Sequence, residues 1–213
     1  MKINYGFLFG ITLFLISCST VIKEANNWIE KSSSNTSGYI TGKYFLLENE
    51  SAKVFLPEGF QQYTIEKYRT ILDSLVTKNN IQNEIRRLEN MRDMDGSFYL
   101  FFDPDSGSTY TINTLPYINF NRNDAKSLLS IIKQNNDKLS LVTDLNFKKL
   151  TATYSKNKNF TMFRSIFQID NFKTDLRGFN TSYIISANKQ TFMINLTTPI
   201  QVNFDPYIEK MKF

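Results

Sequence analysis

The sequence predicts an α+β domain with a mostly antiparallel β-sheet packed between helices. Segments rich in β-branched and aromatic residues follow one another through short turns, as the strands of β-hairpins do. Segments whose apolar residues recur at the spacing of one helix face interrupt these hairpins. Hydrophobic residues make up 41% of the 213 residues and aromatic residues 15%, which is enough to build one ordinary core.

The first half of the domain is expected to alternate hairpins with helices. Pro57-Glu58-Gly59 breaks the chain after two strands, and Thr64 is a plausible cap for the helix that follows. The run 103–107 contains the turn residues Asp, Pro, Ser and Gly and is typical of a hairpin turn. The elements expected here are strands over 39–47 and 52–56, helices over 64–76 and 81–92, and strands over 97–102 and 108–115.

The second half is expected to be one long helix followed by antiparallel strands. Asn123 or Asp124 can cap this helix, which is predicted to end near Asn135 and Asn136. Alternation along the next strand changes phase at Lys148-Lys149 and indicates a β-bulge. The elements expected after the helix are strands over 145–154, 160–172, 183–187 and 191–196, and a short helix over 206–212 with Asp205 as its cap and Pro206 at its first position.

This order of elements resembles the Mog1/PsbP-like fold. The resemblance begins at the strand that ends in Leu56-Pro57-Glu58-Gly59-Phe60 and continues to the C-terminal hairpin and helix, over residues 52–213. The N-terminal extension and the doubled helix up to Arg92 depart from that pattern. The resemblance implies the fold and a binding or accessory role, but it assigns no role to any single residue.

The N-terminus has the pattern of a secretory leader that ends in a cysteine. Lys2 supplies the positive charge, residues 6–16 are apolar, and Leu15-Ile16-Ser17-Cys18 resembles the lipobox of bacterial lipoproteins. The resemblance implies cleavage between Ser17 and Cys18 and acylation of the Cys18 thiol. An unlipidated secreted protein and an uncleaved anchor are the alternatives, although the apolar run is shorter than the 20 or so residues that span a membrane.

These features divide the chain into a signal peptide over 1–17, a lipidated N-terminus and flexible tether over 18–38, and one domain over 39–213. The polar run 32–38 cannot bury enough surface to fold and is typical of a linker. Ser19, with no acidic residue beside it, favours the outer membrane if the cell has two membranes. The expected partners are the membrane and an envelope protein or glycan, and a nucleic acid is not expected.

The composition excludes several classes of catalytic site. The chain has no histidine, and its single cysteine is assigned to the lipid, so Ser-His and Cys-His pairs and His- or Cys-ligated metals are excluded. Carboxylates, Ser-Lys pairs and tyrosines remain. The densest acidic group is Asp93, Asp95, Asp103 and Asp105, but its spacing does not fit a calcium loop. We expect no metal site and no cofactor.

Three other groups have both a functional and a structural interpretation. Ser130 and Lys133 have helical spacing, but such pairs are common on helices. Tyr110, Tyr117 and Phe120 are suited to a groove for sugar rings or a peptide, whereas packing in the core is the more frequent role of such residues. Residues 126–189 contain eleven Lys or Arg against four Asp, which suits either an anionic partner or a solvated sheet face.

The sequence therefore predicts an envelope lipoprotein with a non-catalytic binding or accessory domain. The alternative from another class is a carboxylate-dependent hydrolase of cell-surface glycan, with Asp103 and Asp105 as its catalytic candidates. A third interpretation is an exposed, adhesin-like module. The ligand and the role of the basic region over 126–189 are left open.

Overall fold

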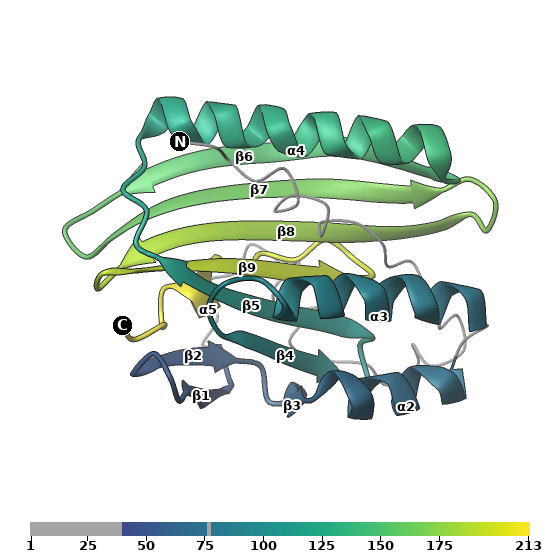
Figure 1. Cartoon of the computed structure of the whole chain (residues 1–213), viewed down its shortest axis with the longest axis horizontal. Helices are drawn as coiled ribbons and strands as arrows, with labels where there is room; N and C mark the ends of the chain where they lie inside the picture. The colour runs from purple at the N-terminus through teal and green to yellow at the C-terminus, as the bar shows by residue number, and fades with distance from the viewer. Residues whose placement is uncertain (1–39, 76–77) are drawn as a thin grey trace.

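The computed structural model describes residues 40–75 and 78–213 (Figure 1). Ser17, Cys18 and the predicted tether lie outside the described residues. Within this part of the chain, no helix combines the length and the hydropathy needed to cross a membrane. The elements, in chain order, are β1 (Lys43–Leu47), β2 (Ala52–Leu56), β3 (Gln61–Tyr63), α2 (Ile65–Leu75), α3 (Lys78–Arg92), β4 (Phe98–Asp103), β5 (Ser108–Pro116), α4 (Arg122–Val142), β6 (Leu145–Lys156), β7 (Phe160–Asn171), β8 (Leu176–Ala187), β9 (Gln190–Thr198) and α5 (Asp205–Ile208).

The predicted α+β class and the antiparallel sheet are confirmed. Seven strands form the main sheet in the order β3-β4-β5-β9-β8-β7-β6, and every neighbouring pair is antiparallel. β1 and β2 form a separate two-stranded hairpin. Because β9 pairs with β5, the last strand of the chain joins the β4–β5 hairpin to the three strands that follow α4.

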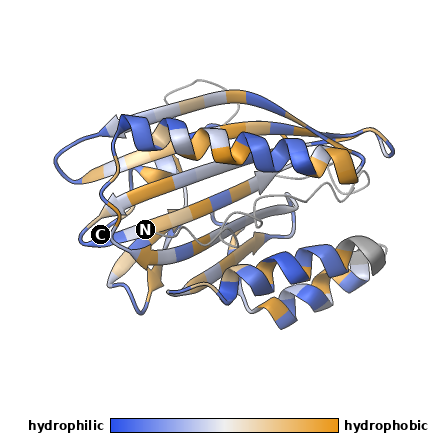
Figure 2. Ribbon diagram, turned by 45° about the horizontal axis from the view of Figure 1, so that its top comes forward, coloured by the Kyte–Doolittle hydropathy of each residue, from blue (hydrophilic) through white to orange (hydrophobic). Residues whose placement is uncertain are grey.

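The two faces of the main sheet carry different layers. Leu100 and Phe102 pack against α2 and α3, while Phe163 and Phe167 pack against α4. The strand register places all four side chains on one face, which we call the helix face, and Figures 1 and 2 show these helices on the same side of the sheet. The opposite face, which we call the hairpin face, carries the β1–β2 hairpin, α5 and the C-terminus.

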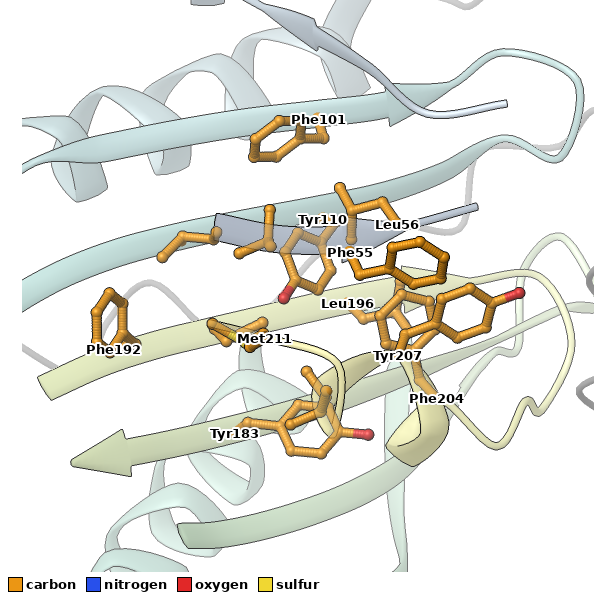
Figure 3. Close-up of a cluster of buried hydrophobic side chains, with 14 of the residues drawn as sticks. Phe55, Leu56, Phe101, Tyr110, Tyr183, Phe192, Leu196, Phe204, Tyr207 and Met211 are labelled. Atoms are coloured by element: carbon orange, nitrogen blue, oxygen red, sulfur yellow. The ribbon is translucent and has the colours of Figure 1, made fainter. Parts of the chain in front are cut away.

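The core of the hairpin face is rich in aromatic residues (Figure 3). The rings of Phe204 and Tyr207 stack with centroids 4.7 Å apart, and Tyr110 lies 5.6 Å from Phe204. α5 is also held by charge, because the Asp205 carboxylate forms a salt bridge with Arg164 and accepts a hydrogen bond from the Tyr183 hydroxyl at 2.9 Å. The C-terminal segment is therefore an integral part of this core.

The structure corrects the predicted limits of α4. The helix is capped by Asn121, not by Asn123 or Asp124, and Asp124 instead completes a capping box at the third helical position. The helix also continues through Asn135 and Asn136 to Val142. Asn136 is buried on the side of α4 that faces the sheet, so packing against the sheet outweighs the low helix propensity of asparagine.

The structure also corrects α5 and several strands. Asp205 is the first residue of α5 and does not cap it, because its carboxylate is engaged by Arg164 and Tyr183. β8 begins at Leu176, seven residues earlier than expected, and the short β3 was not predicted. The phase change near Lys149 is confirmed as a register shift between Lys149 and Thr151.

Candidate functional site

A groove lies between the first half of α4 and the strands β6 and β7 at the edge of the helix face. Its volume is about 340 Å³, which is at the lower end of the range for small-ligand sites. α4 supplies one wall, and β6 and β7 supply the floor and the other wall. The lining residues are Arg122, Ala125, Lys126 and Leu129 from α4, Ala152, Thr153 and Tyr154 from β6, and Phe163 from β7.

The sequence of α4 explains its wall. Arg122, Lys126 and Leu129 are separated by four and three residues, so they lie along one side of the helix. The first turn is fixed by the capping box, in which the Asn121 side chain accepts from the backbone N–H groups of Asn123 and Asp124. Figure 2 shows the resulting hydrophilic start of α4 above the sheet.

The bulge in β6 explains the floor. After the register shift between Lys149 and Thr151, Ala152 pairs with Ser165 and Tyr154 pairs with Phe163. The shift therefore aligns Ala152 and Tyr154 with the helix face, where the small Ala152 leaves room below α4. The Tyr154 ring contacts the buried Phe120 edge-to-face at 6.1 Å, which holds the aromatic wall in place.

The electrostatic character of the groove is positive. Arg122 and Lys126 stand exposed at its mouth, and neither forms a salt bridge within residues 40–75 and 78–213. The lining set contains no Asp or Glu. The Asp124 carboxylate, on the same turn of α4, accepts a hydrogen bond from the Asn121 N–H at 2.8 Å as part of the cap. The groove thus combines an apolar floor with two cations.

A row of polar side chains continues from this floor across the helix face. Ser165 lies beside Ala152, and the same transverse row continues through Ser182 and Asn195 to Thr111. The Ser182 hydroxyl donates to Asn195 Oδ1 at 2.8 Å. All four residues are buried, and Ser165 Oγ, Asn195 Nδ2 and Thr111 Oγ1 have no hydrogen-bond partner among the described residues. This row is unusual because buried polar groups are normally paired.

The four predicted aspartates do not form one site. Asp93 and Asp95 lie in the connection before β4, whereas Asp103 is the last residue of that strand, which is about 17 Å long. Asp103 is fully buried and accepts hydrogen bonds from the Asp105 N–H at 3.2 Å and the Ser106 hydroxyl at 2.6 Å, whereas Asp105 is exposed. In the described part of the chain, no three His, Cys, Asp or Glu residues are arranged to hold a metal.

Asp103 also explains the glycine of the preceding turn. A Cβ atom at Gly59 would lie 2.8 Å from the Asp103 carboxylate, so a larger residue at position 59 would displace the buried acid. The carboxylate thus holds the turn between β4 and β5 through Asp105 and Ser106 and leaves no room for a side chain at position 59. Asp103 and Asp105 therefore have a structural role in the turn between β4 and β5.

The other candidate groups are also separated by the fold. Ser130 and Lys133 are both exposed on α4. Tyr110 is buried on the hairpin face, Phe120 is buried on the helix face, and Tyr117 is 52% exposed, so these three rings do not line one groove. Of the basic side chains over 126–189, only Lys126 lines the groove between α4 and β6.

The carboxyl group with the most altered pKa belongs to Glu84 on α3. Burial of Glu84 raises its pKa to about 7, and the neighbouring Arg87 guanidinium opposes this increase. Arg87 donates to both carboxylate oxygens, at 2.6 and 2.7 Å. The pair lies on the buried side of α3 and is not part of the groove lining.

Sequence reasoning missed most of the groove. Arg122 and Tyr154 were not proposed as site residues, and Lys126 appeared only as one member of a basic region. The four-residue spacing of Arg122 and Lys126 was the available indication, because residues at this spacing are neighbours on a helix. The paired strand positions were not predictable without the register.

Comparisons with known proteins support the fold. No protein-family profile and no curated protein matches the chain. The solution structure of cyanobacterial PsbP from Synechocystis aligns with a TM-score of 0.50 and 11% identity, over 84% of this chain and 96% of that chain. This similarity supports a PsbP-like arrangement of the elements, and at this identity it concerns the fold alone.

Two further structures align over much of the chain. The Ran-binding protein Mog1p from Saccharomyces cerevisiae aligns with a TM-score of 0.44 and 10% identity, over 76% of this chain and 79% of that chain. A protein from Bacteroides thetaiotaomicron aligns with a TM-score of 0.46 and 12% identity, over 81% of this chain and 48% of that chain.

Proposed function

We propose that this protein is a lipid-anchored, non-catalytic binding or accessory protein of the bacterial envelope, and that its ligand occupies the groove between α4 and β6. The observation that carries the proposal is the groove itself. It combines an apolar floor with two cations that have no salt bridge in the described residues. Concave apolar sites with a few polar groups at fixed positions are typical of ligand-binding sites.

The placement of the aspartates favours this proposal over the glycan hydrolase. Glycoside hydrolysis requires two carboxyl groups facing the scissile bond, one of which gives or takes a proton. Asp103 is buried and holds the turn that contains Asp105, while Asp93 and Asp95 lie at the other end of β4. Turnover of peptidoglycan or polysaccharide by the purified chain, lost in Asp103→Asn with the fold intact, would contradict the proposal.

The binding role is tested by filling the groove. We expect native mass spectrometry of the chain extracted from membranes to show a bound small molecule. Ala152→Phe places a ring in the floor and should remove the bound mass. Ser155→Phe is the matched control, because this position lies on the same strand and is exposed. Retention of the same mass by Ala152→Phe would show that the groove is not the binding site.

The anchor is tested separately at Cys18, which follows the predicted cleavage position. Acyl chains hold a protein on a membrane durably only when two or more are present. Cys18→Ala should therefore move the protein from the membrane fraction to the soluble or unprocessed pool. A variant that is still cleaved and retained on membranes would exclude lipidation of Cys18.

A further inference from the structure

We propose that the groove binds a small organic anion, with its charged head between Arg122 and Lys126 and its apolar body on the floor formed by Ala152 and Phe163. This inference rests on the proposed function of the groove as a binding site. It adds the chemical class of the ligand, which the proposal above leaves open.

The charges at the mouth argue for an anion. Arg122 and Lys126 are one helical turn apart on α4, and like charges at this spacing repel one another. No acidic residue lines the groove, and the nearby Asp124 carboxylate is engaged with the Asn121 N–H of the cap. An anionic head between the two cations relieves their repulsion and gains a charge-assisted hydrogen bond from each.

The floor argues for an apolar body. Ala125 and Phe163 are buried, Leu129 and Ala152 are half-buried, and all four side chains are hydrocarbon. A free inorganic anion would leave this surface in contact with water, whereas an alkyl or aryl group would cover it. The volume of about 340 Å³ limits the ligand to a small molecule.

A third group at the groove is suited to orient the head. Tyr154 lines the groove from β6, and its hydroxyl forms no hydrogen bond with residues 40–75 or 78–213. A phenolic hydroxyl can donate to a carboxylate oxygen that also accepts from the guanidinium. The groove therefore offers two cations and one neutral donor around an apolar floor.

The test uses hexanoate as the probe. Acetate carries the charged head without the alkyl chain, and hexanol carries the alkyl chain without the charge. The full chain is reconstituted in lipid nanodiscs, and binding is measured by calorimetric titration. The Ala152→Phe chain in identical nanodiscs is the blank for uptake by the lipid. We expect saturable hexanoate binding above this blank, and binding of acetate and hexanol at least tenfold weaker.

Charge variants then locate the head. Arg122→Gln and Lys126→Gln should each weaken hexanoate binding about five- to tenfold, and the loss should shrink at high salt. Lys138→Gln removes the same charge from an exposed position near the other end of α4 and should leave the affinity unchanged. The variants exchange surface side chains, so their folding is not at risk.

The outcomes separate this inference from the proposed function. If hexanol binds as tightly as hexanoate and the Gln variants bind normally, the ligand is not an anion, but the groove is still a binding site. If none of the three probes binds above the blank, the proposal that the ligand is a small organic anion is wrong. If, in addition, Ala152→Phe retains the small molecule that accompanies the wild-type chain from membranes, the groove is not a binding site and both proposals fail.

Discussion

The two faces of the central strands differ in chemistry although they share one backbone. On the hairpin face, β5, β9 and β8 present aromatic and aliphatic side chains that merge with the β1–β2 hairpin and α5. On the helix face, the same three strands present mainly hydroxyls and amides, together with the apolar Ile184 and Met193. The hairpin face carries Tyr110, Ile112, Ile194, Leu196, Tyr183 and Ile185, and the helix face carries Thr111, Asn113, Asn195, Thr197, Ser182 and Asn180.

The polar and apolar side chains of these strands therefore contribute differently to stability. Burial of the apolar face supplies the free energy that folds the sheet, at roughly 25 cal/mol for each Å² of apolar surface removed from water. The polar side chains of the other face add little, because a buried hydrogen bond contributes only about 1 kcal/mol net and an unpaired group costs about 1–3 kcal/mol. Substitutions of these polar side chains are therefore expected to cost less stability than substitutions in the aromatic core, and the groove that we propose as a ligand site lies at the edge of the same helix face.

The largest loss of stability is expected for substitution of an aromatic core residue on the hairpin face. Phe101 is fully buried, and its ring lies 5.0 Å from Phe45 and 6.1 Å from Tyr110. Phe101→Ala should lower the free energy of unfolding by about 3–5 kcal/mol through lost transfer energy and a residual cavity. Urea denaturation measures this change. A loss below 1 kcal/mol would mean that the hairpin face is not the main source of stability.

The next largest effect on stability is expected at Glu84 of α3. Burial of this side chain raises its pKa to about 7. An unfolded glutamate loses its proton near pH 4.5, so between pH 4.5 and 7 the folded state holds a proton that the unfolded state has released. The contribution of Glu84 to stability is therefore complete below pH 4.5 and falls by about 2–3 kcal/mol as the pH rises to 7.

The measurement compares the wild type with Glu84→Gln between pH 5 and 8. Glutamine keeps the volume of the protonated acid and has no charge to lose, so the stability of the variant relative to the wild type should rise with pH. Other carboxylates titrate equally in both chains and cancel in the difference. A difference that is constant over this range would show that Glu84 is ionised in the folded state throughout.

Elements that depend on local sequence pattern were predicted, whereas those that depend on distant contacts were not. β-Branched and aromatic content identified β2, turn residues identified the β4–β5 hairpin, and a change in alternation identified the bulge in β6. These features depend on local side-chain pattern and turn chemistry. The predicted end of α4 was wrong because Asn136 is held in the helix by packing against the sheet, and no local sequence pattern encodes this packing. The capping role of Asp205 was wrong because Arg164, 41 residues away, engages its carboxylate.

The groove was beyond sequence reasoning for the same physical reason. Its floor requires that Ala152 faces Ser165, and this pairing depends on where the bulge shifts the register of β6. Its positive character depends on the fact that the Asp124 carboxylate is turned to the cap. The predicted acidic site is wrong for the opposite reason. Asp93 and Asp105 are close in sequence, but β4 separates them in the structure.

An intermediate effect is expected for the ion pair that ties α5 to the hairpin face. Asp205 is partly exposed and is bonded to Arg164 and to the Tyr183 hydroxyl. Asp205→Asn keeps the size of the side chain but removes its charge, and should cost about 1–2 kcal/mol of stability. Limited proteolysis should then release the C-terminal residues faster than in the wild type. An unchanged cleavage rate would indicate that aromatic packing alone holds α5.

The smallest effect is expected on the helix face, at Thr111. Its Oγ1 is buried and has no partner within residues 40–75 and 78–213, so Thr111→Val replaces an unsatisfied hydroxyl by a methyl group of similar size. Relief of the desolvation cost should leave stability unchanged or raise it by up to about 1 kcal/mol, in contrast to the loss at Phe101 on the neighbouring strand. Urea denaturation of both variants under one buffer condition gives the comparison directly. If Thr111→Val instead destabilises the protein by more than 1 kcal/mol, the hydroxyl has a partner in solution, and the polar row is a stabilising network comparable to the aromatic core on the other face.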